Sequence, residues 1–184
     1  GGAAAVVAPF AGFRAEHAFG QRPEAPERPI LFTNLRLFDG VTAEVRDGVN
    51  VLVDGNTVAA LLALDDTVTD AQIVDCGGRL AMPGLIDAHW HTTLCAVEVM
   101  DLLTADVPFI HLVSAREAER TLMRGFTSVR DTGGPAFALK RAIDQGIVNG
   151  PRIYPSGAMI SQTSGHADFR FRFDVPRGET TPLA

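Results

Sequence analysis

Cysteine is one of the residues this sequence has least of. Only Cys76 and Cys95 occur among its 184 residues, which is too few for a disulfide scaffold or for a zinc site built from cysteines. We expect both to be small buried apolar residues. Lysine is scarcer still, because Lys140 is the single lysine of the chain.

Positive charge and long apolar runs are also scarce. Sixteen Lys and Arg residues stand against 22 Asp and Glu residues, which leaves a net charge of −6, and no basic run occurs. This balance argues against a nucleic-acid partner. No apolar stretch approaches the roughly 20 residues of a membrane-spanning helix, so we expect no membrane partner.

The N-terminal segment leaves the compartment open. Residues 1–9 are rich in Ala and Val but lack the basic start and long apolar core of an intact signal peptide. A cytoplasmic and a periplasmic location are both compatible with this segment, and we slightly favour the cytoplasm.

Composition divides the chain into three parts, and 46% of its residues are hydrophobic, which is enough for a buried core. Residues 1–29 read as an N-terminal arm or linker, because three prolines lie within 21–29. Residues 30–82 read as a small antiparallel β unit. Its strands are expected at Ile30–Phe38 and, on either side of an Asp-Gly-Asn hairpin turn, at 48–53 and 57–64.

Residues 83–184 change to an α/β pattern. Strands are expected at 85–89, 126–130 and 152–159, the last interrupted by Pro155, with helices at 110–123 and from Pro135 to Gly146. Strand and helix in alternation predict a parallel sheet with crossover helices. Three such βα steps are too few for an eight-stranded barrel, which takes roughly 250 residues.

Two histidines form the strongest chemical signal, in the stretch Asp87-Ala88-His89-Trp90-His91. Residues two apart on a strand share a face, so His89 and His91 can present two imidazoles to one ion while Trp90 packs against a helix on the other face. Neutral imidazole suits zinc and its neighbours. Two ordinary core or surface histidines are the alternative, but the carboxyl end of such a strand is where α/β folds place their sites.

Two further residues lie at the same predicted rim. His166 follows the third strand among small polar residues, where it can bind a substrate carboxylate or carbonyl; the alternative is that it fixes its own loop through Asp168. Asp131 ends the second strand, and we favour a salt bridge or loop hydrogen bond for it over a role in catalysis. His17 and His111 read as ordinary residues.

Three segments in order resemble a known family. Residues 82–91 resemble the first barrel strand of the amidohydrolase superfamily of metal-dependent hydrolases, whose signature is Asp-x-His-x-His. Residues 125–134 and 150–170 resemble the second and third strands of its imidazolonepropionase-like and prolidase-like dipeptidase branch. The resemblance implies the first three βα units of a TIM-type (β/α)8 barrel, within 83–184, and part of a small β-sandwich domain in 30–82.

The resemblance also implies a cofactor and a mechanism. His89 and His91 match first-strand ligands, usually to zinc, in a site with two divalent metal ions. The family's other ligands, including a carboxylated lysine, come from later strands, and Lys140 lies in a helical stretch and cannot be that lysine. In the complete enzyme the metal lowers the pKa of bound water to about 7, so that hydroxide attacks the amide, and a carboxylate passes the proton to the leaving nitrogen. The catalytic residues are expected in a C-terminal part outside this sequence.

The implied function is hydrolysis of an amide or peptide-like bond. Substrates of that branch include dipeptides, N-acyl amino acids and amide-linked xenobiotics such as ochratoxin. Two alternatives stay open: hydrolysis of a cyclic amide, as in imidazolonepropionase-like members, and a non-catalytic homologue that serves as a scaffold.

The expected sheet also implies partners. A three-stranded parallel sheet would expose an open edge at 152–159, so we expect residues 1–184 not to form a stable soluble monomer alone. Remaining C-terminal polypeptide, or a second chain, is expected to continue the sheet. We also expect a homo-oligomer.

Overall fold

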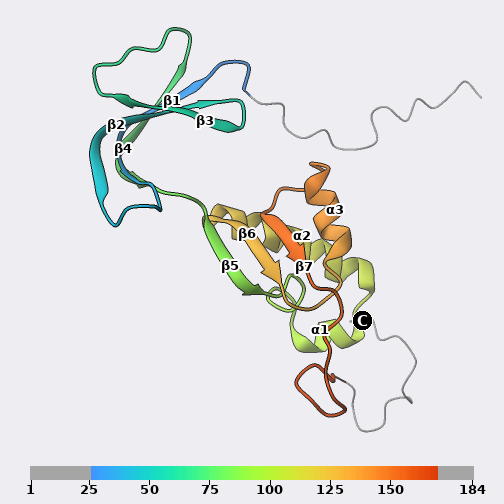
Figure 1. The fold of residues 1–184 in the computed structure, drawn as a ribbon. Coiled ribbons are helices and arrows are strands. Elements are labelled where there is room, and N and C mark those ends of the chain that lie inside the picture. The colour runs from blue at the N-terminus through green and yellow to red at the C-terminus, as the bar shows by residue number, and fades with distance from the viewer. Residues whose placement is uncertain (1–25, 170–184) are drawn as a thin grey trace, which may run out of the picture.

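The chain forms a mixed α/β structure with two separate sheets (Figure 1). The computed structural model describes residues 26–169, in which one sheet has four strands in the order β3-β2-β1-β4 and the other has three in the order β5-β6-β7. Most of the expected N-terminal arm, with His17, and residues 170–184 of the expected third part lie outside the described residues.

The first sheet contains the predicted hairpin. Its strands are β1 (Ile30–Phe38), β2 (Val45–Asp54), β3 (Thr57–Ala63) and β4 (Gln72–Ala81). Asp54 pairs with Thr57 across the turn, where Gly55 has φ of 59°, a conformation that favours glycine in a two-residue hairpin loop. Along β1, Leu31, Leu35 and Leu37 are buried in alternation with exposed residues.

The expectation of a purely antiparallel unit is wrong. β1 pairs antiparallel with β2, but on its other side it pairs parallel with β4, and Ile30 lies opposite Gln72. The connection after β3 carries the chain to the far edge of the sheet, so β4 enters in the same direction as β1. Hairpin signals report only neighbouring strands, and β4 was not predicted. Residues 30–82 form a single sheet layer among the described residues.

One ion-paired turn joins β1 to β2. The carboxylate of Asp39 accepts hydrogen bonds from the backbone N–H groups of Val41 and Thr42, each at 2.9 Å, and forms an ion pair with Arg46. These backbone hydrogen bonds, Thr42 first, favour the charged carboxylate and lower the pKa of Asp39 to about 2.

The second sheet carries the predicted strand–helix alternation. Its parallel strands are β5 (Leu85–Trp90), β6 (Phe126–Asp131) and β7 (Arg152–Pro155), and its helices are α1 (Val99–Thr104), α2 (Val107–Met123) and α3 (Phe137–Asp144). α2 ends before Gly125, which has φ of 96°. Across residues 26–169, only β5 and β6 are followed by helices; none follows β7.

Several elements differ from the sequence prediction, and β2, for example, begins at Val45 rather than 48. α1 was not predicted, and six residues give too little periodicity to show a helix. α2 begins at Val107 rather than 110 because a proline is compatible with its first turn. β7 stops at Pro155 rather than 159, since proline has no N–H to donate to the sheet.

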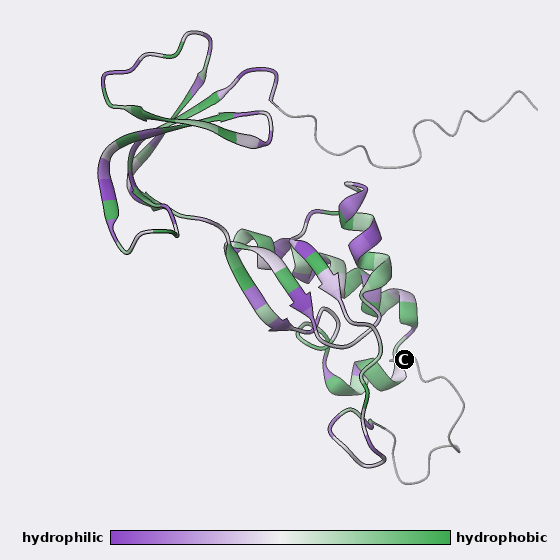
Figure 2. Cartoon of the chain, viewed as in Figure 1, coloured by the Kyte–Doolittle hydropathy of each residue, from purple (hydrophilic) through white to green (hydrophobic). Residues whose placement is uncertain are grey.

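The core of the second unit lies between its sheet and the helices α2 and α3. Trp90, Val129 and Ile153 from three adjacent strands cluster with Ala118 of α2 and Leu139 of α3. Trp90 is 7% exposed, which confirms that it packs against helices. Hydrophobic segments alternate with hydrophilic ones along β5 and β6, and the carboxyl ends of both strands are hydrophilic (Figure 2). Hydrophilic residues therefore lie at the edge of this sheet where the carboxyl ends of β5 and β6 meet.

We predict that Asp39→Asn weakens the first sheet in a pH-dependent way. The carboxylate has a pKa below its ordinary 3.8 in the folded chain, so its stabilisation is complete above about pH 4 and is lost as the pH falls through about 2. The difference in urea midpoint between wild type and variant should therefore be largest at about pH 5, where Asp39 is ionised in both the folded and the unfolded chain. It should shrink as the pH is lowered.

Circular dichroism during urea denaturation measures this difference. Asp65→Asn, at an exposed aspartate outside the Asp39 turn, is the matched control. A difference between wild type and Asp39→Asn that does not change with pH would contradict the assignment.

Candidate functional site

The two predicted imidazoles lie side by side at the carboxyl end of β5. The ring centroids of His89 and His91 are 5.2 Å apart, with an angle of 75° between the ring planes. His89 is exposed and His91 is half-buried, whereas the intervening Trp90 is buried in the core. The strand therefore separates one apolar anchor from two nitrogen donors.

The loop after β6 holds the ring of His91. Its Nδ1 lies 3.1 Å from the backbone oxygen of Gly133, and its Nε2 lies 3.3 Å from the hydroxyl oxygen of Thr132. A carbonyl oxygen only accepts, so the contact with Gly133 requires the proton on Nδ1. Nε2 is then the nitrogen with a lone pair, able to accept from a hydroxyl or to ligate a cation.

Asp131 is a fully buried carboxylate that joins the ends of β5 and β6. It accepts hydrogen bonds from the backbone N–H of Thr92 at 2.7 Å, from the Thr92 hydroxyl, and from the backbone N–H of Gly133 at 3.0 Å. It forms no ion pair within residues 26–169. These contacts agree with the loop hydrogen bonding favoured for Asp131.

Sequence reasoning missed the residues that support His91. Thr92, Thr132 and Gly133 each contact His91 or Asp131, and the sequence pattern alone assigns none of them a role. One sequence signal could have found these supporting residues. Small polar residues directly follow two adjacent parallel strands, and the carboxyl ends of such strands meet at one edge of the sheet.

His166 lies in the loop after β7, and its side chain is exposed. The loop is closed by its own contacts: the Asp168 carboxylate accepts from the backbone N–H of Ser164 at 2.8 Å, and Gly165 N–H donates to Gln162 O at 2.9 Å. Substrate binding by His166 stays a prediction. His111 lies half-buried on α2.

The cysteines are less buried than expected. Cys76 is half-buried and Cys95 is exposed, because Cys95 lies in a turn after His91 and not in the core. Partial burial of its sulfur and the nearby Glu117 carboxylate raise the pKa of the Cys95 thiol to about 11. The thiol is therefore protonated at neutral pH and is not an activated nucleophile.

The donors at β5 fit part of a divalent-metal site. Two neutral imidazoles are the ligand type that zinc and its neighbours prefer, and the Gly133 contact fixes the tautomer that leaves Nε2 of His91 available. No group of three or more His, Cys, Asp or Glu side chains arranged for metal binding occurs in the described part of the chain. The described residues thus offer two imidazole donors, which is fewer than a complete metal site needs.

No helix within residues 26–169 has the length and hydropathy needed to cross a membrane.

Comparison with known proteins assigns this architecture to a family. Residues 80–182 match the model of the amidohydrolase family. Ochratoxinase of Aspergillus niger is 37% identical over 101 residues, which cover 53% of this chain and 20% of the relative. Imidazolonepropionase of Rhizobium rhizogenes is 36% identical over 67 residues, which cover 33% of this chain and 16% of the relative. The chain thus matches about a fifth or less of the length of these two relatives.

A solved structure extends the likeness beyond the matched family segment. The crystal structure of a prolidase complexed with N-methylphosphonate-L-proline superposes with a TM-score of 0.72 at 33% identity, over 81% of this chain and 36% of the prolidase chain.

We predict that Asp131→Asn destabilises this edge of the sheet. An amide NH2 in place of one carboxylate oxygen confronts an N–H or O–H donor of Thr92 or Gly133, so the free energy of unfolding should fall by about 1–3 kcal/mol. Thr92→Val is the matched comparison, because it removes one hydroxyl and keeps the backbone donor; it should cost about 1 kcal/mol. Urea denaturation of both variants gives the values, and a stability of Asp131→Asn equal to wild type would refute the role.

Proposed function

Because the chain belongs to the amidohydrolase family, we propose that it forms part of a metal-dependent hydrolase that cleaves an amide, peptide-like bond. The juxtaposition of His89 and His91 at the carboxyl end of β5 is the observation that carries this proposal. Their ligand type, their position on the sheet and the tautomer of His91 all suit a shared cation.

The fold supports the same proposal. β5, β6 and β7 are parallel and lie in the order of the sequence, with helices after the first two, as in the opening part of a (β/α)8 barrel. The four-stranded sheet is then part of the accompanying small β-sandwich domain. In such a barrel the carboxyl ends of the strands carry the site, and His89, His91 and Asp131 all lie at those ends.

In this proposal His89 and His91 hold zinc, as part of a site for two divalent ions whose other ligands come from polypeptide beyond the described residues. When bound, the metal polarises the scissile carbonyl and activates water. Gly133 keeps the proton on Nδ1 of His91 and so orients its ring. Asp131 holds the loop that carries Gly133 and has no part in the chemistry.

His166 supplies recognition of the substrate. It is exposed in a loop that follows β7, and the tight turn closed by Asp168 sets its position. An imidazole there can donate to a carboxylate or carbonyl oxygen. A dipeptide, an N-acyl amino acid or an amide-linked compound such as ochratoxin carries both groups, and the ochratoxinase and prolidase likenesses favour this class. The similarity to imidazolonepropionase supports a cyclic amide as the second candidate.

We predict that in the complete enzyme His89→Ala and His91→Ala each reduce bound zinc and slow amide hydrolysis at least about 100-fold, since each removes a metal ligand. Elemental analysis gives the metal content per chain, and assays with a proline dipeptide and with ochratoxin give the rate. His111→Ala on α2 is the control and should keep both. Wild-type zinc content in His89→Ala or His91→Ala would disprove metal binding by that residue. A complete wild-type protein that is metal-free and inactive would favour the scaffold alternative.

A separate variant tests recognition of the substrate. His166→Ala should raise KM or lower kcat while zinc stays bound, because the imidazole contacts the substrate and not the metal. His166→Gln, which keeps a donor, should recover part of the loss. Loss of zinc from His166→Ala would instead show that this residue is a ligand, and unchanged kinetics would remove it from the site.

A further inference from the structure

The outward side of α2 carries an ordered row of exposed residues. We call Phe109, Leu112, Arg116, Glu119 and Met123 the outer stripe of α2. Their spacing alternates between three and four residues, as along the contact seam of a coiled coil. The three apolar members are 48%, 71% and 81% exposed in that order. Large apolar side chains so exposed on one helical seam suit an interface better than a solvated surface.

Within residues 26–169, the apolar members of the outer stripe take no part in the core clusters. The buried residues of α2 are Ile110, Ser114, Ala118 and Thr121, which occupy the opposite side of the helix. Ala118 belongs to the core with Trp90 and Val129. α2 therefore has two distinct sides, and the packing of the sheet explains only one of them.

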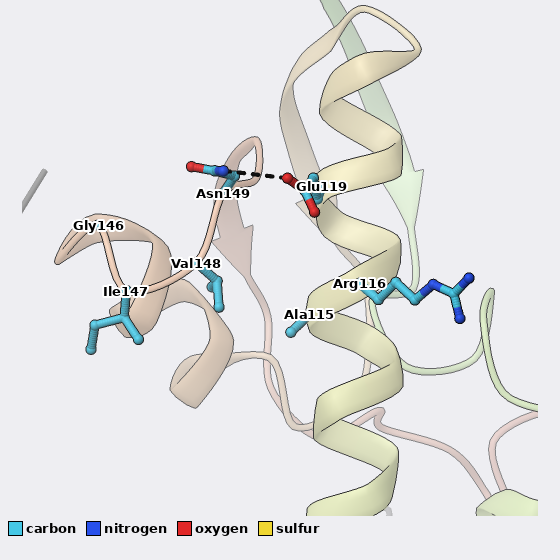
Figure 3. A pocket seen from close by; sticks show the side chains of 7 residues that line it. All are labelled: Ala115, Arg116, Glu119, Gly146, Ile147, Val148 and Asn149. Atoms are coloured by element: carbon cyan, nitrogen blue, oxygen red, sulfur yellow. Dashed lines mark hydrogen bonds between the residues drawn. The ribbon is translucent and has the colours of Figure 1, made fainter. Parts of the chain in front are cut away.

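The charges at the centre of the stripe lack ionic partners. Arg120 and Arg124 both pair with Glu117 on the flank of α2, whereas Arg116 forms no ion pair within residues 26–169. Glu119 Oε1 accepts the Asn149 side-chain amide at 3.3 Å and has no basic partner in the same range. Arg116 extends away from the loop that carries Asn149 (Figure 3). Arg116, which has no ionic partner in the described part of the chain, and Glu119 thus lie three positions apart between Leu112 and Met123.

We propose that a second copy of this chain docks on the outer stripe, with the two α2 helices antiparallel about a two-fold axis that passes between Glu117 and Ala118. This register places Arg116 of each copy opposite Glu119 of the other, and Leu112 opposite Met123, so every pair occurs twice. A parallel arrangement sets Arg116 against Arg116 and is disfavoured. The inference goes beyond the proposed hydrolysis and does not depend on it.

The surroundings of Glu119 suit this arrangement. An open hollow of about 370 Å³ lies beside it, between α2 and the loop after α3, and is lined by Ala115, Arg116, Ile147 and Val148 among others (Figure 3). The aliphatic part of Arg116 from the second copy can pack there while its guanidinium reaches Glu119. The central ion pairs then specify register and direction, and the flanking apolar pairs provide the buried area.

Charge exchange tests the interface in the intact protein. Arg116→Glu and Glu119→Arg each place like charges opposite one another and should raise the dissociation constant of the assembly at least about 100-fold. Mixing the two single variants restores both opposite-charge pairs, as does the double variant Arg116→Glu/Glu119→Arg. Arg141→Glu, at an exposed arginine on α3, is the matched charge reversal outside the stripe and should have no effect.

Sedimentation equilibrium over a range of concentrations measures the assembly, and circular dichroism verifies that each variant is folded. Loss of association in both single variants with recovery in the mixture supports the proposal. A monomeric wild type, single variants that associate like wild type, or a mixture that fails to recover overturns it. Recovery in the mixture distinguishes charge repulsion from loss of folding, even if one variant is less stable than wild type.

Discussion

The buried carboxylate of Asp131 is the contact on which the candidate site depends. It accepts two hydrogen bonds from Thr92, just after His91, and one from Gly133, so it holds the chain that leaves β5 against the chain that leaves β6. Gly133 in turn engages the ring of His91. A buried charge is costly unless its oxygen atoms accept hydrogen bonds. Here the donors belong to the two segments, after β5 and after β6, that the site brings together.

The ends of two neighbouring strands contribute different groups to the candidate site. The end of β5 supplies His89, and His91 follows directly after the strand, so the two imidazoles lie side by side. β6 supplies orientation, through a carbonyl and a hydroxyl on either side of the His91 ring. The two imidazoles and the groups that orient His91 therefore come from the ends of neighbouring strands of a parallel sheet, which suits a site that must hold its geometry before a substrate arrives.

The helical layer shows a similar division. The inner side of α2 packs Ala118 against Trp90, which anchors the strand that carries the histidines. Its outer side carries charged residues and exposed apolar residues, and the apolar ones take no part in the core clusters of the described residues. The proposed contact with a second copy would brace α2 from outside, and through Trp90 it would stiffen the strand beneath.

Local pattern was enough to predict β1, the Asp54–Thr57 hairpin, the strand–helix alternation after residue 82 and the pairing of His89 with His91, because backbone periodicity places these residues without reference to distant segments. It failed for the parallel pairing of β1 with β4, for the exposure of Cys95 and for the support of His91 by Thr132 and Gly133. Each of these depends on which segments meet in space. The Asp131 contact joins residues 39 positions apart in the chain, and no local spacing encodes such a meeting, since it follows from the order in which strands enter a sheet.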